Sequence, residues 1–170
     1  VMSFDLNSLY PHLIMQYNIS PETLVADKAV KNMSVEKMLN KEVDTSILKD
    51  ATMTPNGALF KTTQKGFLPE LMQKMYDDRV KFKQLMIEAQ KDYEKTKDPK
   101  LLRDISKFNN IQMAKKISLN SAYGAIGNVW FRYYNILVAE AITTSGQLAI
   151  RYIEHSLNQY LNKILNTRGE

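Results

Sequence analysis

Cysteine is absent from the 170-residue sequence, which excludes disulfides, thiolate zinc sites and catalysis by a cysteine nucleophile. No apolar run approaches the roughly 18 residues of a membrane-spanning helix, and the N-terminus does not have the pattern of a signal peptide. We therefore expect an intracellular protein with no membrane partner. The apolar content of 44% is ordinary for a soluble core, and the length suits one domain.

Both ends of the sequence are abrupt. The first residues, Val1 to Phe4, have the pattern of the middle of a strand with no lead-in, and the sequence stops equally suddenly at Glu170. We therefore expect the chain to be an excerpt from a longer polypeptide.

The positive charge is concentrated in one segment. Residues 65–116 hold 13 Lys and Arg against 8 Asp and Glu, whereas the remaining residues hold 10 of each sign. The whole net charge of +5 therefore falls in this segment, as expected if the segment meets phosphates. A solvated helical hairpin would produce the same composition, so charge alone leaves both interpretations open.

Hydrophobic patterning predicts an α+β chain that is mostly helical. Residues 1–7 have the pattern of a buried strand, and Pro11 suits the first turn of a helix that reaches about Tyr17. The turn sequence Pro55-Asn56-Gly57, the apolar run 58–60 and the pair 67–68 indicate a small hairpin.

Apolar residues at helical spacing predict two long helices, from Pro69 to about residue 97 and from Pro99 to about Tyr123. Each has about 25 residues, or roughly 37 Å. Because the connection is so short, the two helices must be antiparallel neighbours. A break at 124–128 and an aromatic segment, for which an extended conformation is one interpretation, precede a third strong helix over about 138–165.

The segment KKISLNSAYG contains the most informative stripe of the sequence. At about 100° per residue, Lys116, Asn120 and Tyr123 fall on one helix face, just before Gly124, which we expect to end the helix. A cation, an amide and an aromatic ring on one face would suit a long anionic ligand with a ring at one end. Taken singly, Lys116 is equally typical of a solvated charge, Asn120 of a helix cap and Tyr123 of a core aromatic.

A second candidate group lies near the N-terminus and on the first long helix. Asp5 follows an apolar run, where a rigid strand could present a carboxylate to Mg²⁺, although a capping role is the simpler interpretation. Tyr10, beside a proline, is also typical of a packing residue. Arg79 and Lys83 are one helical turn apart and could meet phosphates from the same face, although such a spacing is common on surfaces.

The joint pattern is more specific than its parts. D-x-x-S-L-Y-P near the N-terminus and K-x-x-x-N-S-x-Y-G about 110 residues later resemble the A and B motifs of family B DNA polymerases, which have a right-hand shape. The resemblance covers the whole chain. The segments NISPET, PNGALF, GFLPELMQKMYDDR and GNVWFRYYN, and the helix from Ala141, are similar to the replicative polymerases of tailed phages.

The resemblance implies a two-metal phosphoryl-transfer site. Asp5 would be one of two aspartates that bind two Mg²⁺ ions, with the carbonyl of Leu6 as a further ligand. The backbone amides of Ser8 and Leu9 would hold the triphosphate. Tyr10 would press its ring under the sugar, leaving no room for a 2′-hydroxyl, and would thereby select deoxynucleotides.

The resemblance also implies that three cations, Arg79, Lys83 and Lys116, grip the incoming triphosphate. Lys116 would in addition donate a proton to the leaving pyrophosphate, and Asn120 would support the triphosphate contacts. Phosphoryl transfer requires positioning of the reactants and neutralisation of the triphosphate charge. Metals on a rigid strand and cations on a mobile hairpin would together supply these two requirements.

In the implied domain division, the fingers would be the hairpin 65–123, and parts of the palm would be 1–64 and 124–170. Tyr123 and Gly124 would lie beneath the nascent base pair. The implied partners are primer–template DNA, deoxynucleoside triphosphates, the remainder of the polymerase chain and a sliding clamp bound through other parts. The implied location is the cytoplasm of a phage-infected host cell.

Two features limit the resemblance, a third difference at His12 affects no implied role, and two other function classes compete with it. The family's second metal-binding aspartate follows in a D-T-D-S motif, which the sequence lacks, so we expect the isolated chain to be inactive. No thumb or exonuclease carboxylate cluster is recognisable, and His12 stands where relatives often carry serine. A non-catalytic nucleic-acid-binding helical module would ignore magnesium, and a plain helical interaction domain would respond to neither nucleotide nor salt.

Overall fold

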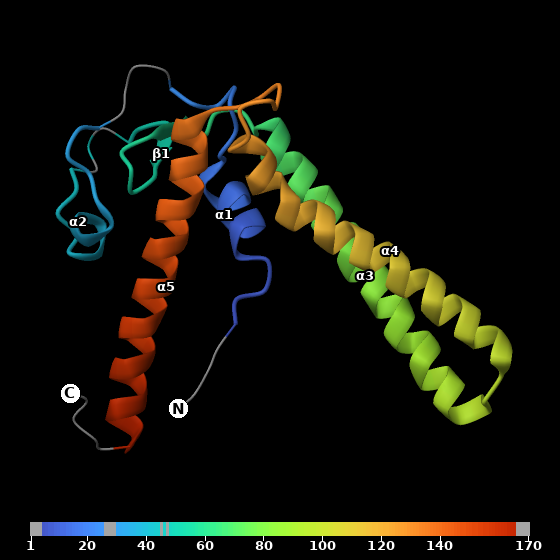
Figure 1. Cartoon of the computed structure of the whole chain (residues 1–170). Coiled ribbons are helices and arrows are strands. Elements are labelled where there is room, and N and C mark those ends of the chain that lie inside the picture. The colour runs from blue at the N-terminus through green and yellow to red at the C-terminus, as the bar shows by residue number, and fades with distance from the viewer. Residues whose placement is uncertain (1–4, 26–29, 45, 47, 166–170) are drawn as a thin grey trace.

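The computed structural model describes residues 5–25, 30–44, 46 and 48–165, which form a mostly helical fold with one small sheet. In chain order, the elements are α1 (Leu9–Tyr17), α2 (Val35–Leu39), β1 (Ala51–Met53), β2 (Leu59–Lys61), α3 (Phe67–Thr96), α4 (Pro99–Ile126) and α5 (Ile136–Leu165). The predicted predominance of helix is confirmed. Figure 1 shows the α3–α4 hairpin and α5 diverging from a common junction, with α1 between them.

The small sheet matches the predicted hairpin only in part: its turn and its second strand fall where the hairpin was expected, but the first strand, β1, lies in a segment for which no strand was predicted. Strands β1 and β2 are antiparallel, with Thr52 opposite Phe60, and the turn that joins them contains Pro55-Asn56-Gly57. Gly57 has φ +84°, and a Cβ there would lie 2.2 Å from the carbonyl oxygen of Val30, so both conformation and space require glycine. The pair 67–68 lies outside the hairpin, because it forms the first turn of α3.

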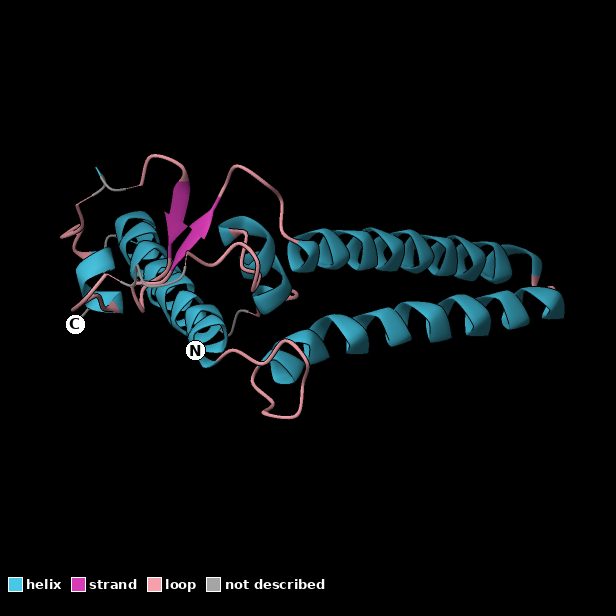
Figure 2. Cartoon of the chain, turned by 90° about the horizontal axis from the view of Figure 1, so that it is seen from above, coloured by secondary structure: helices cyan, strands magenta, loops and turns pink. Residues whose placement is uncertain are grey.

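The long helical hairpin has the predicted antiparallel form and sharp turn. Helix α3 ends in Lys97, whose left-handed conformation closes the helix, and the side chain of Asp98 accepts a hydrogen bond from the amide of Lys100 to cap α4. Pro99 occupies the first turn of α4, where its missing N–H costs nothing. Figure 2 shows the two helices running side by side away from the rest of the molecule.

The apolar core lies at the junction of the elements rather than along the hairpin. Its buried members come from α1, the sheet, the bases of α3 and α4, and the first turns of α5: Ile14, Ile19, Ala58, Phe60, Leu68, Met72, Leu119, Ile126, Val138, Ala139, Ala141 and Ile142. Farther out the helices cover only each other. Three residues that we expected to face inward, Leu71, Leu102 and Ile117, are exposed.

Three local predictions were wrong. Asp5 and Leu6 are not in a strand, since no described strand pairs with them, and the rest of the predicted strand, 1–4, lies outside the described residues. Helix α4 continues through Gly124 to Ile126, because an isolated glycine weakens a helix without ending it, and Gly127 is the cap. The aromatic segment 129–134 contains successive turns instead of extended backbone.

Candidate functional site

The loop before α1, residues 5–8, exposes both a charged side chain and backbone groups. Asp5, Leu6 and Asn7 are exposed, and Ser8 has left-handed backbone angles, φ 55° and ψ 46°, at the start of the helix. The side chain of Ser8 does not cap α1, so the first helical amides, beginning with Leu9, lack an intrahelical partner. Uncapped amides at a helix N-terminus attract anions.

Arg79 connects α3 to this loop. Its guanidinium Nη1 donates hydrogen bonds to Asn7 Oδ1 at 3.3 Å and to Ser8 Oγ at 3.1 Å, and its side chain is only 8% exposed. Its Nε is buried and has no hydrogen-bond partner in the described part of the chain, so some donor capacity is unused. The structure thus brings one predicted phosphate-binding cation to the loop that follows Asp5.

A hollow of about 470 Å³ extends from Asn7 along α3. Its lining includes Tyr76 and three cationic side chains, those of Arg79, Lys83 and Lys91. Charge, shape and the neighbouring helix N-terminus make this hollow suitable for a polyanion. Lys91 was not among the predicted site residues, although its spacing of two turns from Lys83 could have indicated it.

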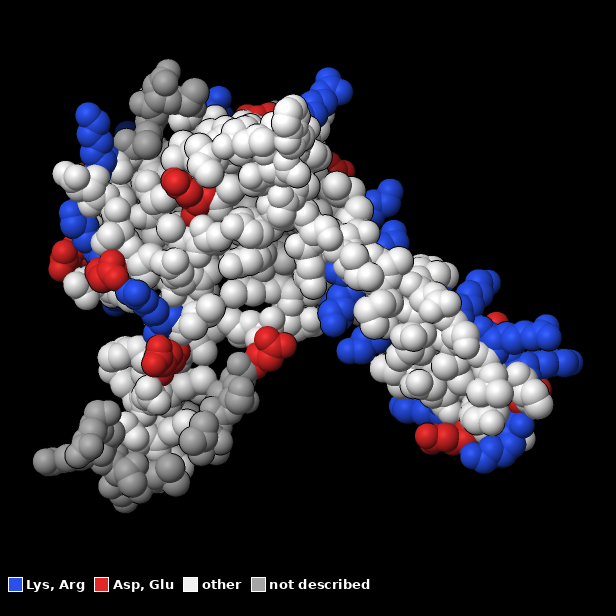
Figure 3. Space-filling model, viewed as in Figure 1, with Lys and Arg blue, Asp and Glu red and all other residues white. Residues whose placement is uncertain are grey.

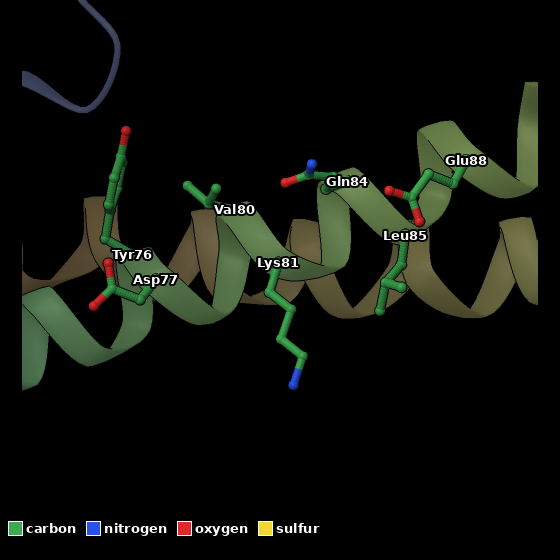
Figure 4. Close-up of a pocket in the computed structure, with 7 residues that line it drawn as sticks. All are labelled: Tyr76, Asp77, Val80, Lys81, Gln84, Leu85 and Glu88. Atoms are coloured by element: carbon green, nitrogen blue, oxygen red, sulfur yellow. The ribbon is translucent and has the colours of Figure 1, made fainter.

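The neighbouring face of α3 is shown in Figure 4. Tyr76, Val80 and Gln84 project to one side of the helix, whereas Lys81 projects to the opposite side. All seven residues lining this shallow surface come from α3, so it is a groove along one helix and not a cavity between elements.

The predicted stripe on α4 is present but only partly connected to the loop. Lys116 and Asn120 are exposed, and among the described residues no hydrogen bond or ion pair joins either of them to residues 5–8. The adjacent Lys115 instead pairs with Asp78 of α3 at 2.7 Å. The hydrogen bond from Lys115 lowers the pKa of Asp78 below its ordinary value. The ion pair makes Lys115 a contact between the two hairpin helices.

Tyr123 is the stripe residue that does reach the N-terminal group. Its ring centroid lies 5.0 Å from that of Tyr10, with the rings tilted by 47°, and both side chains are half-buried. Gly124 is exposed one residue farther along α4, and a Cβ there would meet nothing within 4 Å. The structure therefore joins the two predicted motifs through a pair of tyrosines.

Three residues beside the site, Asn7, His12 and Gly146, have no role predicted from the sequence. His12 contacts the loop, because its Nδ1 donates a hydrogen bond to the carbonyl oxygen of Ser8 at 2.8 Å. Its ring makes a T-shaped contact with that of Tyr76, with the ring centroids 4.7 Å apart. Gly146 lies against the ring of Tyr10. A glycine inside a helical pattern is a weak signal of close packing, whereas no pattern marked Asn7 or His12.

Asp5 lines a separate hollow of about 800 Å³ between the loop and α5, together with Glu154, two asparagines and several apolar side chains. Within the described ranges, no group of three or more His, Asp or Glu residues is arranged to hold a metal. An exposed carboxylate fits magnesium, which proteins often hold through one or two carboxylates plus phosphate oxygens. Asp5 is thus a single exposed carboxylate of the kind that magnesium sites use.

Lys and Arg side chains gather over the α3–α4 hairpin in Figure 3. The basic surface therefore follows the two hairpin helices. Among the described residues, no helix combines the length and the apolar content that a membrane span needs.

Comparisons with known proteins agree with the sequence patterns. The family described as DNA polymerase family B matches residues 1–169. All of this chain aligns with the DNA-directed DNA polymerases of Escherichia phage RB69, at 33% identity, and Enterobacteria phage T4, at 30% identity. The chain spans only 23% of the length of each phage relative.

The fold also matches part of a solved polymerase structure. The family B DNA polymerase from the hyperthermophilic archaeon Pyrobaculum calidifontis superposes with a TM-score of 0.65 over 91% of this chain and 17% of the archaeal chain. At 24% identity this likeness concerns the fold alone. The helical hairpin and small sheet are therefore part of a known polymerase architecture.

Proposed function

Because the chain belongs to DNA polymerase family B, we propose that it is the central part of a template-directed DNA polymerase that adds deoxynucleotides to a primer 3′ end. In this proposal, 65–123 is the fingers hairpin, and 1–64 and 124–170 are parts of the palm. Primer–template DNA, deoxynucleoside triphosphates, the rest of the polymerase chain and a sliding clamp are the partners, in the cytoplasm of a phage-infected cell.

The observation that carries the proposal is the contact of Arg79 with the loop before α1. This contact brings a helix bearing Arg79, Lys83 and Lys91 beside the uncapped amides at Leu9. Phosphoryl transfer depends chiefly on positioning and on neutralising the phosphate charge. Cations and amide dipoles that converge on one hollow supply both, so we assign the triphosphate to the hollow beside Asn7.

The α4 stripe would complete this site from the other helix. Lys116 is exposed and unpaired in the described part of the chain, so it is available to the triphosphate and to the leaving pyrophosphate as a proton donor. Asn120 would support these contacts, and Tyr123 and Gly124 would lie beneath the nascent base pair. Movement of the hairpin toward the palm would make catalysis depend on a fitted base pair.

Tyr10 would form a steric wall beneath the sugar of the incoming nucleotide, which we call the sugar wall. Its ring packs against that of Tyr123, with the centroids 5.0 Å apart, and this packing favours a wall of defined position. Such a wall discriminates against a larger sugar by a steric clash, which is an effective form of negative selection. We therefore propose that Tyr10 excludes ribonucleotides.

Asp5 and the carbonyl of Leu6 would hold magnesium at the loop, with a further aspartate from outside this chain. When bound, two magnesium ions stabilise the attacking and leaving oxygens of phosphoryl transfer. The chain's own contribution is to carry Asp5 on the same short loop as Asn7 and Ser8, which Arg79 contacts. Its exposure suits this role, since a buried and fully bonded carboxylate would have no free oxygen.

Asp5→Asn in the complete polymerase tests the proposal. We expect magnesium-dependent primer extension to fall by about 10³-fold or more, because the substitution removes the charge that anchors a metal. Binding of primer–template DNA should not weaken, because the variant removes a negative charge. Asp50→Asn, a matched substitution at an exposed aspartate beside β1, should extend primers at the wild-type rate.

The basic hairpin also favours a second candidate, a non-catalytic nucleic-acid-binding module. In that case, DNA binding would depend on the hairpin charges, and neither magnesium nor Asp5 would matter. Wild-type extension by the Asp5→Asn variant would contradict the catalytic role of Asp5. Absence of any magnesium-dependent extension by the complete wild-type chain, with DNA binding retained, would favour the binding module.

A further inference from the structure

Gly146 of α5 lies directly against the ring of Tyr10. A Cβ built at this glycine would lie 2.9 Å from Tyr10 Cε1 and 3.6 Å from Cδ1. Real Cβ atoms essentially never approach another heavy atom within 3.0 Å, so any side chain here requires the Tyr10 ring or the backbone of α5 to shift. The next nearest atom, Leu13 Cδ1 at 3.8 Å, is at an ordinary contact distance, so the conflict concerns Tyr10 alone.

The backbone of α5 gives no other reason for a glycine at this position. Gly146 is in the interior of the helix and its φ is not positive, so it has the conformation that an alanine would adopt readily. Glycine inside a helix destabilises it relative to alanine. The glycine therefore costs helix stability, and the space taken by Tyr10 is the feature that requires it.

Tyr10 is confined on a second side. The ring of Tyr123, from α4, lies 5.0 Å from it, centroid to centroid. Gly146 is buried, so the contact with Tyr10 is part of the packed interior and not an accident of the surface. The position of the Tyr10 ring is thus set jointly by α4 and α5, two elements that are far apart in the sequence.

We propose that Gly146 is a specificity-determining positioning residue, whose lack of a side chain sets the depth at which the Tyr10 ring stands beneath the sugar of the incoming nucleotide. This inference rests on the proposed function of Tyr10 as the sugar wall. A methyl group at 146 pushes the ring away from α5, and the ring then also has to shift against its neighbour Tyr123. The ring then leaves its place under the sugar and opens space for a 2′-hydroxyl, because packed side chains respond to overpacking by shifting.

The test is single-turnover insertion of matched deoxynucleotides and ribonucleotides by the complete polymerase carrying Gly146→Ala. We expect the ratio of deoxynucleotide to ribonucleotide insertion efficiency to fall by about tenfold, which corresponds to about 1.4 kcal/mol. Gly127→Ala is the matched control, since a Cβ there meets nothing closer than 3.9 Å. Its ratio should equal that of the wild type. A Gly146→Ala ratio within about threefold of the wild type, or above it, would overturn the inference.

A double variant separates action through Tyr10 from a general loss of packing. In the Tyr10→Ala background the clash is absent, so Gly146→Ala should change the insertion ratio no further. The melting temperature gives a second readout if Gly146→Ala alone folds poorly. Gly146→Ala should lower the melting temperature of the wild type but not that of Tyr10→Ala. An equal drop in both backgrounds would show that Gly146 does not act through Tyr10.

The same data distinguish failure of the inference from failure of the proposed function. If Tyr10→Ala relaxes ribonucleotide exclusion but Gly146→Ala does not, only the role of Gly146 is refuted. If Tyr10→Ala leaves exclusion unchanged, Tyr10 is not the sugar wall, and the role of Gly146 in specificity is refuted with it.

Discussion

Lys115 and Lys116 are adjacent in sequence but differ in their surroundings. Lys115 is paired with Asp78 across the helical hairpin, whereas Lys116 is exposed on the neighbouring face, about 100° around α4. A diffuse basic patch would use both lysines equally. A triphosphate site of defined geometry would use only one of the two lysines. Within the described ranges, Lys116 is the lysine whose ammonium group is free to contact the triphosphate, because Lys115 is already paired.

Lys116→Ala in the complete polymerase should lower the single-turnover insertion rate by roughly 10²-fold or more, because it removes a charge directed at the triphosphate in the transition state. Lys115→Ala is the matched control. It should leave the insertion rate unchanged and only slightly lower the stability of the hairpin, because a partly exposed ion pair contributes little. Equal losses of insertion rate in the two variants would indicate a diffuse patch.

Tyr10→Ala should admit ribonucleotides. The substitution removes a steric wall rather than an attractive contact, so deoxynucleotide insertion should fall far less than discrimination between the sugars. The measurement is single-turnover insertion of a matched pair of nucleotides that differ only at the 2′ position. Unchanged exclusion of ribonucleotides would refute the assignment of Tyr10 as the sugar wall.

At the scale of elements, Arg79 has two functions in this account. It is part of the proposed triphosphate site, and it also ties α3 to the loop before α1 through Asn7 and Ser8. Lys83, one turn farther along α3, is exposed and has only the first function. The two cations should therefore give different results when removed.

Both Arg79→Ala and Lys83→Ala should weaken nucleotide affinity in the complete polymerase. Arg79→Ala should in addition lower the free energy of unfolding by about 1–2 kcal/mol, because a buried side chain with packed methylene groups is lost. Lys83→Ala should change it by less than about 0.5 kcal/mol. Nucleotide titration and denaturant unfolding would measure the two effects. A nucleotide affinity unaffected by both substitutions would exclude α3 from the triphosphate site.

Elements with strong local signals could be predicted from the sequence. The two hairpin helices have long apolar stripes and a proline between them, and the turn at Pro55-Asn56-Gly57 has a characteristic sequence, so each was found within a few residues. The predictions of a strand at Asp5 and of a helix end at Gly124 were wrong, because strand pairing and the continuation of a helix depend on residues elsewhere in the fold.

The site was predictable in its residues but not in its contacts. The motif resemblance selected Tyr10 and Tyr123, and the structure places their rings in contact. The bond from Arg79 to Asn7 and the close approach of Gly146 to Tyr10 join residues more than 70 positions apart. Such contacts arise from tertiary packing and leave no mark in local periodicity.

At the scale of the whole molecule, the chain contains a buried core but only part of the proposed catalytic site. The described residues include one carboxylate at the loop before α1, and the proposed two-metal site needs a second anchor. The hairpin nevertheless carries the basic surface that would meet DNA (Figure 3).

The isolated chain should therefore bind duplex DNA weakly and extend no primer. Its affinity should fall at least tenfold between about 50 and 200 mM salt, because binding that depends on counterion release weakens as salt rises. Fluorescence anisotropy with a labelled primer–template would measure the binding, and a gel assay with all four deoxynucleotides would measure extension. Magnesium-dependent extension by this chain alone would show that a second carboxylate lies within it.

The central claim is that the loop before α1 and the stripe on α4 bind one nucleotide together. Hydrogen exchange in the complete polymerase, bound to a primer that ends in a dideoxynucleotide, tests this claim without allowing chemistry. The matched deoxynucleoside triphosphate should slow amide exchange both at residues 8–10 and at 116–123, whereas a mismatched one should protect neither segment. Protection of only one segment, or equal protection by matched and mismatched nucleotides, would contradict the account.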